Sequence, residues 1–207
     1  MGHFVADVQH DPAPLFVVLS GPSGAGKDTL LRALLDADPG LATIVTAKTR
    51  RPRVGEIDGV NHLFLSEAEF RAQVDAGAFL EHAEVYGHLS GVPRDQVRRY
   101  LDAGATVIVR TDVQGARTLR ERVPGAVLVF LTVPDRATLE RRLRARNTDS
   151  EAELQGRLSA AVQEMADADW FDYVIVNRED DQAEAVRHAL KIIAQERARP
   201  GRPTPAV

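Results

Sequence analysis

Short runs of consecutive hydrophobic residues alternate along the chain with longer segments in which hydrophobic and polar residues are mixed. Runs of the first kind are typical of strands buried on both faces of a parallel sheet, and the mixed segments are typical of amphipathic helices. The pattern predicts an α/β fold whose core is a five-stranded parallel sheet flanked by helices. The predicted strands span residues 15–19, 43–45, 106–109, 126–131 and 173–176.

The alternation changes between about residues 46 and 93, where turn-forming residues are frequent. RPRVGEIDGVNHLFLS reads as a hairpin, and Ser66 with Glu69 gives the capping-box pattern that opens a helix. This region therefore predicts a lobe inserted into the sheet domain rather than another strand and helix repeat. A helix over residues 95–102 leads the chain back into the core.

The two ends of the chain carry less structural information. Residues 1–14 lack a charged stretch followed by an apolar run, so we expect an N-terminal extension and no signal peptide. Residues 199–207 are rich in proline and arginine, and we expect them to be a disordered tail. The domain itself is predicted to span residues 15–198.

Composition narrows the class of protein. A chain of 207 residues, 44% hydrophobic and 27% charged, suits one globular domain. Its formal charge of -4 gives no general attraction to nucleic acid, and no segment approaches the roughly 20 apolar residues that span a membrane. The absence of cysteine excludes disulfides and fits a reducing compartment. We expect a cytoplasmic monomer or homodimer that binds neither nucleic acid nor membranes.

The strongest local motif is LSGPSGAGKDT, residues 19–29, which follows the first predicted strand and opens a helix. Glycines at these positions let backbone N–H groups surround a phosphate, and a lysine at the end of the loop reaches the β- and γ-phosphates of a nucleotide. Lysine occurs at only three positions in this chain, so a lysine within the loop is informative. The predicted ATP-binding residues of the loop are Gly21, Ser23, Gly24, Ala25, Gly26, Lys27, Asp28 and Thr29.

Asp28 departs from the usual motif, which has serine or threonine after the lysine. The usual hydroxyl is a magnesium ligand, and a carboxylate also binds magnesium, although it brings negative charge close to the polyphosphate. Thr29 cannot take over that place, because it lies about 100° further round the helix. Two interpretations of Asp28 stay open: it ligates the metal directly or through water, or it is an acid that stabilises the first turn of the helix.

A dense basic turn, TAKTRRPR, occupies residues 46–53. Arg50 and Arg53 have the chemistry to hold one phosphate group with paired N–H donors. A solvated basic loop or a nucleic-acid patch are the alternatives. Because no aromatic residues and no wider basic face accompany the turn, a small phosphorylated molecule is the better interpretation.

Six segments together resemble the guanylate kinase family: GPSGAGK, TRRPRVGEIDGV, GAFLEHAEVYG, TDVQGARTLR, RRLRARNTDSEAELQGRL and FDYVIVN. They occur in the family's order and spacing from about Leu15 to Ile193. The resemblance implies a P-loop core, an acceptor-binding lobe over about 46–93 and a helical lid over about 136–160. It also implies transfer of phosphate from ATP to GMP with Mg²⁺ as the cofactor.

The resemblance assigns roles in the acceptor lobe. Arg50 and Arg53 match the arginines that bind the acceptor phosphate, and Glu81 matches the carboxylate that reads guanine. A carboxylate accepts hydrogen bonds from both N1–H and the exocyclic amine of guanine, and adenine offers no such pair. Thr46 stands in place of a serine that contacts the base. Asp112 matches an acid at the closed seam, although it also reads as the N-cap of the next helix.

In the lid, the resemblance makes Arg146 and Arg157 contacts of the transferring phosphate and of ATP. Together with Lys27 and Arg50 they form the predicted catalytic set. Many arginines of this segment would simply face water, which is the alternative for both lid residues. Asn177 matches a position beside the adenine, but a residue that ends a strand in a turn fits it equally.

The chain departs from the family's pattern near the acceptor. His62 and Ser90 stand where tyrosines usually bind the acceptor phosphate, and Val92 replaces a hydroxyl residue that touches guanine. We keep His62 and Ser90 as candidate acceptor contacts. Arg110 replaces an acid two positions before Asp112.

Two other families remain as alternatives. The GKD sequence and the Asn61–His62 pair also resemble ribose 1,5-bisphosphate phosphokinases, which act on a phosphorylated sugar. That family needs neither Glu81 nor the full TRRPR turn, so their presence favours guanylate kinase. The non-catalytic guanylate kinase-like domains of scaffold proteins lack a working glycine loop, whereas residues 21–27 are intact here.

Overall fold

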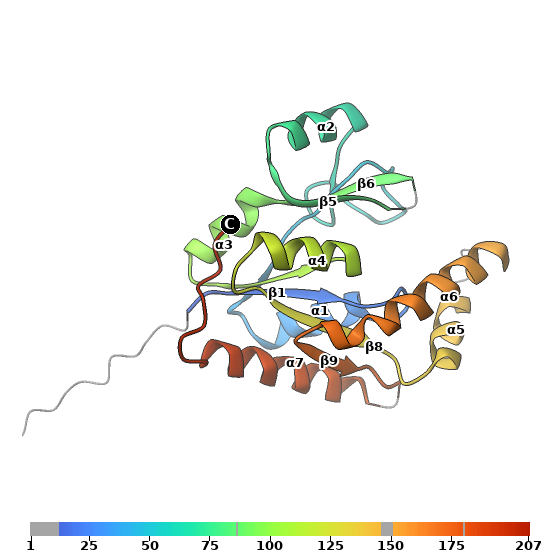
Figure 1. Ribbon diagram of the computed structural model, residues 1–207. Coiled ribbons are helices and arrows are strands. Elements are labelled where there is room, and N and C mark those ends of the chain that lie inside the picture. The colour runs from blue at the N-terminus through green and yellow to red at the C-terminus, as the bar shows by residue number, and fades with distance from the viewer. Residues whose placement is uncertain (1–12, 86, 146–150, 180) are drawn as a thin grey trace, which may run out of the picture.

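The computed structural model describes residues 13–85, 87–145, 151–179 and 181–207. Its centre is a sheet of five parallel strands in the order β2-β7-β1-β8-β9, which confirms the predicted α/β core. Figure 1 shows this sheet with helices on both sides. The strands are β1 (Leu15–Ser20), β2 (Leu41–Thr43), β7 (Thr106–Arg110), β8 (Val127–Thr132) and β9 (Tyr173–Val176).

The second strand lies two residues earlier than the prediction of 43–45. β2 pairs with β7 as far as Thr43 and then ends. The backbone of Val45 is bound instead by Gln96, whose side chain accepts from the Val45 N–H at 2.9 Å and donates to its carbonyl at 3.2 Å. A side chain 51 positions further along thus replaces the strand pairing, which no local pattern reveals.

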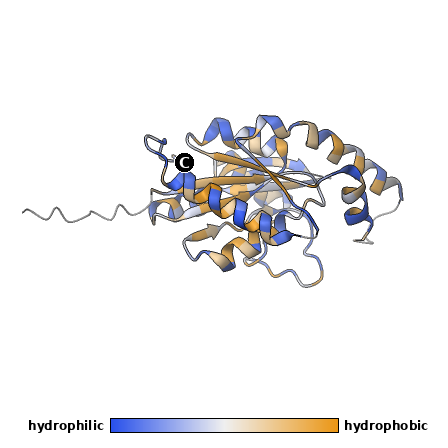
Figure 2. Ribbon diagram, turned by 90° about the horizontal axis from the view of Figure 1, so that it is seen from below, coloured by the Kyte–Doolittle hydropathy of each residue, from blue (hydrophilic) through white to orange (hydrophobic). Residues whose placement is uncertain are grey.

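Four helices cover the sheet: α1 (Lys27–Ala37), α3 (Arg94–Asp102), α4 (Val113–Arg122) and α7 (Gln182–Arg197). Successive side chains of β1 point to opposite faces, and all are buried. Leu15, Val17 and Leu19 pack with α1 and α7, and Phe16 and Val18 pack with α3 and α4. Figure 2 shows the hydrophobic strands between helices that alternate in hydropathy. The burial of both faces explains the continuous hydrophobic run.

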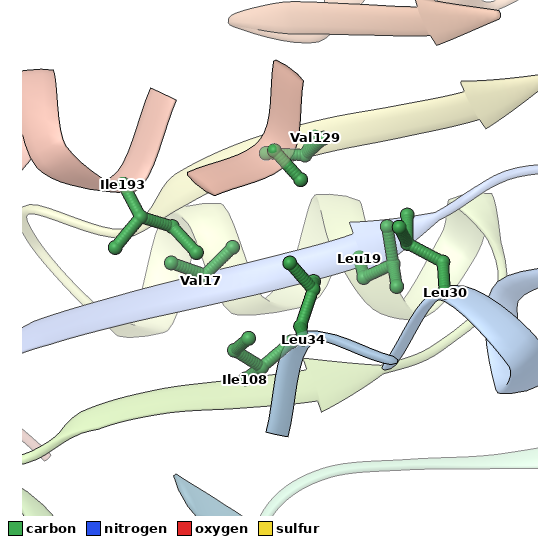
Figure 3. A pocket seen from close by; sticks show the side chains of 8 residues that line it. Val17, Leu19, Leu30, Leu34, Ile108, Val129 and Ile193 are labelled. Atoms are coloured by element: carbon green, nitrogen blue, oxygen red, sulfur yellow. The ribbon is translucent and has the colours of Figure 1, made fainter. Parts of the chain in front are cut away.

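A small cavity of about 10 Å³ lies between β1, α1 and α7. Hydrophobic side chains line it, including Val17, Leu34 and Ile193 in Figure 3. A space of this size holds at most one water molecule, and this lining offers no hydrogen-bond partner. The cavity is therefore a packing gap of the core and not a ligand site.

A second sheet, in the order β4-β3-β6-β5, forms a separate lobe that Figure 1 shows beyond α4. The rings of Phe70 and Phe79 stack in its small core with centroids 4.6 Å apart. Ser66 and Glu69 form the predicted capping box at the start of α2. The elements are β3 (Ala47–Lys48), β4 (Leu63–Phe64), α2 (Glu67–Asp75), β5 (Phe79–Val85) and β6 (His88–Pro93).

Two helices, α5 (Arg136–Arg144) and α6 (Glu151–Ala166), project from the end of β8, and the 3₁₀ turn Ala168–Trp170 leads into β9. They pack on each other through Leu139, Leu143, Leu154 and Leu158. This helix pair is attached to the core at its base and has its own small hydrophobic cluster. It covers the described part of the segment in which the sequence predicts a lid.

The C-terminal segment 199–207 follows a defined path along the core, whereas the sequence suggested disorder. The guanidinium of Arg202 donates to the Pro14 carbonyl at 2.7 Å and to the Glu196 carbonyl at 3.1 Å. The arginine side chain thus joins the end of α7 to the chain just before β1. Among the described residues, no helix combines the length and hydrophobicity needed to cross a membrane.

Candidate active site

The loop between β1 and α1 has the shape that its glycines predict. Gly21, Gly24 and Gly26 all have positive φ angles, which residues with side chains rarely adopt. A Cβ atom at Gly21 would lie 2.0 Å from the carbonyl oxygen of Leu131 in β8, so no side chain fits there. The loop therefore turns tightly over the end of the sheet and presents its backbone at the N-terminus of α1.

The carbonyl of Ala25 holds this loop to the rest of the core. It accepts a hydrogen bond from Asn177 Nδ2 at 2.7 Å and one from Arg142 Nη1 at 3.2 Å. Arg142 Nη2 also donates to the Asn177 carbonyl at 3.1 Å. Asn177 directly follows β9 and is buried. It ends the strand, and its side chain supports the loop. The sequence reasoning missed Arg142, because nothing local distinguishes it from the other arginines of α5.

Lys27 begins α1, and its ammonium group lies over its own loop. Nζ donates to the carbonyls of Gly21 at 2.5 Å and Pro22 at 3.1 Å. Glu164 on α6 lies within reach of this charge: burial raises the pKa of Glu164, and the positive charge of Lys27 opposes that rise. α6 thus places a carboxyl group near Lys27, which the sequence reasoning did not anticipate.

Asp28 forms an ion pair with Arg110, the last residue of β7. Leu19 of β1 is the register partner of Arg110, so the guanidinium starts from the strand beside the loop. Asp28 makes no side-chain cap of α1, whose N-cap is Gly26. Asp28 lies in the first turn of α1, a position common to both interpretations from sequence, and its pairing with Arg110 was not foreseen.

The remaining predicted donor residues lie in three places. Ser23 is half-buried at the tip of the loop, and Thr29 is exposed on α1. Arg157 lies on α6, where it is partly buried. Arg146 lies outside the described residues.

In the lobe, Arg50 is held in a fork by Glu56. Its Nη1 and Nη2 atoms donate to the two carboxylate oxygens of Glu56 at 2.6 and 2.7 Å. The hydrogen bonds from Arg50 hold the pKa of Glu56 at about 2, so this carboxylate stays charged near neutral pH. The N–H of Arg53 also donates to Glu56 at 2.8 Å, and the Arg53 side chain is exposed. Glu56 therefore fixes one arginine and the backbone of the other.

Four further polar side chains of the lobe form two contacts near Arg50. His62 Nδ1 lies 2.8 Å from the hydroxyl of Thr46, and Lys48 Nζ donates to Ser90 Oγ at 2.6 Å. Burial lowers the pKa of His62, and the positive charges of Lys48 and Arg50 lower it further. The structure thus places Thr46, His62, Ser90 and Arg50 near one another, and Lys48 lies beside them. Burial lowers the pKa of Lys48.

Glu81 lies on β5 and is only 5% exposed. Burial, and then the nearby negative charge of Asp112, raise its pKa to about 7. Val92 lies opposite Glu81 in the sheet. Gly115 makes room for the carboxyl group, because a Cβ atom there would lie 3.1 Å from Glu81 Cδ. A buried acid in a small polar site is suited to pairing with N–H donors of a ligand.

Asp112 stands where the two halves of the site meet. Its carboxylate accepts from the Gly115 N–H at 2.8 Å and so caps α4, as one of its two interpretations predicts. Its charge also raises the pKa of Glu81 from the lobe and that of Glu164 from the lid helix. The loop, the lobe and α6 thus converge at the carboxyl end of the core sheet, where parallel α/β folds bind ligands.

The comparisons with known proteins agree with this arrangement. The guanylate kinase family model matches residues 14–196 of the chain. The guanylate kinase of Rubrobacter xylanophilus is 46% identical over 177 residues, covering 86% of this chain and 92% of that protein. The guanylate kinase of Symbiobacterium thermophilum is 44% identical over 188 residues, covering 91% and 88%. The crystal structure of guanylate kinase from Anaplasma phagocytophilum has a TM-score of 0.76 to this chain at 28% identity, covering 92% and 90%.

Proposed function

The chain belongs to the guanylate kinase family, and on that premise we propose that it transfers the γ-phosphoryl group of ATP to GMP, producing ADP and GDP. The observation that carries the choice of acceptor is Glu81, a buried carboxyl group at the seam between the lobe and the core. A sugar phosphate offers this acid only separate hydroxyl donors, whereas guanine offers it a planar pair of N–H donors that matches the two oxygens of a carboxylate.

The donor side is formed by the glycine loop. ATP is expected to place its β-phosphate against the backbone N–H groups at the start of α1, where the helix dipole favours negative charge. Lys27 would then turn from the carbonyls of Gly21 and Pro22 to the phosphates, since a phosphate is a stronger acceptor for an ammonium group. The bonds of Asn177 and Arg142 to Ala25 keep the loop in place during this change.

The acceptor side is formed by the lobe. Arg50 and Arg53 would hold the phosphate of GMP, with Glu56 keeping Arg50 oriented. Thr46, His62 and Ser90 lie close enough together to complete the polar lining. Glu81 would accept from guanine N1–H and the exocyclic amine, and those donors favour its charged form.

The reaction requires that the two substrates are aligned and that the negative charge of the transferred phosphoryl group is neutralised. A phosphate oxygen of GMP attacks the γ-phosphorus in line, the bond to the β,γ-bridging oxygen breaks, and no protein nucleophile is needed. Lys27 and Arg157 would neutralise the moving charge, together with Arg146 of the same segment. Closure of the lobe and the lid helices over both substrates would exclude water and so prevent hydrolysis of ATP.

Magnesium usually accompanies ATP in such reactions, where it neutralises phosphate charge. The side chains at this site do not fit a magnesium ion held by the protein between α1 and β7. Asp28 is engaged by Arg110, and the described residues contain no group of three acidic or histidine side chains that could hold a metal. We propose that Mg²⁺ enters as part of the ATP substrate, on its phosphates.

A screen of acceptors tests the function. Purified protein is given ATP, Mg²⁺ and one of GMP, dGMP, AMP, UMP or ribose 1,5-bisphosphate, and release of ADP is measured. We expect rapid turnover with GMP, weaker turnover with dGMP and little with AMP or UMP. Preferential turnover of ribose 1,5-bisphosphate would replace the proposed acceptor, and no turnover with any of the five would overturn the proposal.

A further inference from the structure

The ion pair between Asp28 and Arg110 joins two positions that face each other across the mouth of the loop. Asp28 lies in the first turn of α1, one residue after the phosphate-binding lysine. Arg110 ends β7, level with Leu19 just before the loop. In P-loop proteins these two places usually carry a hydroxyl and an acid, which hold a magnesium ion between them. Here the acid stands on the helix, and a cation stands at the end of the strand.

The pair adds little to the stability of the fold. The side chain of Asp28 is 73% exposed, and that of Arg110 is 32% exposed. An ion pair with one exposed partner is screened by water and loses side-chain entropy, so it contributes little to folding free energy. Nor does the pair cap the helix, because α1 has Gly26 at its N-cap. The position of the ion pair beside the phosphate-binding loop therefore indicates a role in binding rather than in stability.

We propose that Arg110 is a phosphate-binding residue of the donor site, and that Asp28 is the residue that positions it. The inference rests on the proposed function, because it assumes that the loop binds the polyphosphate of a nucleotide. A guanidinium presents several N–H donors in one plane and binds phosphate with two of them. The guanidinium of Arg110 thus provides a positive charge near the phosphates. In other P-loop sites a bound metal ion provides that charge.

The exchange of partners has a simple electrostatic basis. A bound polyphosphate carries more negative charge than one carboxylate, so the Arg110 guanidinium gains by turning toward it. Asp28 is exposed and can move into water as the phosphates approach. The Arg110 side chain is only 32% exposed, and this burial lowers its pKa, so the partly dehydrated guanidinium favours an anionic partner. The consequence is that binding of a nucleoside diphosphate needs little help from a divalent cation.

Calorimetric titration with ADP, in buffer with EDTA and in buffer with Mg²⁺, measures how far nucleotide affinity depends on the metal, without involving catalysis. We expect the dissociation constant of the unmodified protein to differ by no more than about threefold between the two buffers. Arg110→Gln is expected to weaken ADP binding in EDTA by about tenfold or more, and to weaken it less in Mg²⁺. The double variant Asp28→Ser with Arg110→Asp restores the usual residue types and should make ADP binding strongly dependent on Mg²⁺.

Two controls separate this effect from a general loss of charge or of fold. Arg71→Gln removes an arginine from an exposed ion pair with Glu67 on the lobe, and it should leave ADP binding unchanged in both buffers. The affinity of Arg110→Gln for GMP in EDTA should also be unchanged, because GMP occupies the lobe. If Arg110→Gln binds ADP in EDTA as tightly as the unmodified protein, Arg110 is not a phosphate-binding residue.

A further variant distinguishes a wrong role for Arg110 from a wrong assignment of the loop as the nucleotide site. Lys27→Ala should weaken ADP binding in both buffers if the loop is the nucleotide site. ADP binding that depends on Lys27 but not on Arg110 would refute the role of Arg110 alone. ADP binding that depends on neither residue would overturn the donor site as well.

Discussion

The proposed donor half of the site presents backbone N–H groups to a phosphate, and the proposed acceptor half presents arginine side chains. The loop at residues 21–27 is fixed by its glycine conformations and by bonds from Asn177 and Arg142 to Ala25. In the lobe, Arg50 is fixed by one carboxylate, that of Glu56, and Arg53 extends into solvent. A single substitution should therefore weaken acceptor binding more selectively than donor binding, because the backbone N–H groups of the loop remain when a side chain is changed.

Lys27→Ala should have the largest effect on catalysis. We expect kcat to fall by about a thousandfold, because the ammonium group stabilises charge that develops in the transition state. The melting temperature should change little, since the hydrogen bonds of Lys27 to Gly21 and Pro22 lie within its own loop. Steady-state kinetics with GMP and a thermal melt measure the two quantities. A folded variant that retains normal turnover would contradict the donor-site assignment.

Glu81→Gln should affect the acceptor half alone, by about a hundredfold in kcat/KM for GMP, because one guanine donor would meet an amide N–H. KM for ATP should stay the same. The control is Glu84→Gln on the same strand, an exposed acid that should be silent. Normal kcat/KM for GMP in Glu81→Gln would show that the base is read elsewhere.

The same substitution should stabilise the protein at high pH. The pKa of Glu81 is about 7 in the fold and 4.5 in the reference state, so the folded protein binds the proton more tightly. The free energy of unfolding therefore falls as the pH rises from about 4.5 to 7. Above pH 7 the whole loss of stability from the buried, charged carboxylate is present. Glu81→Gln should melt at a higher temperature than the unmodified protein at pH 8, with a smaller or no advantage at pH 4.5. An equal difference at both pH values would mean that the carboxyl group is not buried as described.

Arg50→Ala and Arg53→Ala should raise KM for GMP by about tenfold to thirtyfold, with little change in ATP binding. Glu56→Gln should give a smaller increase, because it loosens Arg50 without removing it. Initial rates at varied GMP and ATP give each constant separately. If Glu56→Gln had the larger effect, the carboxylate itself would contact the substrate.

The pH dependence of GMP binding should show the smallest effect. Because Glu81 must be charged to accept two hydrogen bonds, KM for GMP should rise about tenfold from pH 8 to pH 6, with an inflection near 7. KM for ATP serves as the internal control and should lack this inflection. In Glu81→Gln the inflection near pH 7 should disappear.

The sequence predicts those parts of the site that depend on neighbours along the chain. The glycine loop, the capping box at Ser66 and the buried run of β1 each follow from local residue patterns, and the structure has all three. Glu81 was identified through the family resemblance, since a lone acid in a strand has no local signature. Arg50 and Arg53 were indicated first by the dense basic turn at residues 46–53.

The parts that the sequence could not predict are pairs between distant segments. Arg142 and Ala25 are 117 positions apart, and α5 contains three other arginines that look equivalent in sequence. The pairing of Asp28 with Arg110 depends on β7 lying beside β1, which becomes known only with the strand order. The end of β2 depends in the same way on Gln96. Local patterns carry no information on which of several polar residues will meet.

The bond from Asn177 to the Ala25 carbonyl joins residues that are 152 positions apart, and this has a consequence for synthesis. A ribosome makes the glycine loop first and releases Asn177 only after most of the domain has emerged. Until then the loop lacks the partner that holds Ala25, and a chain that stops before β9 has the nucleotide-binding sequence without its final shape. The loop therefore reaches its final shape only once the chain has been synthesised through Asn177, and we expect the proposed nucleotide binding to begin at that point.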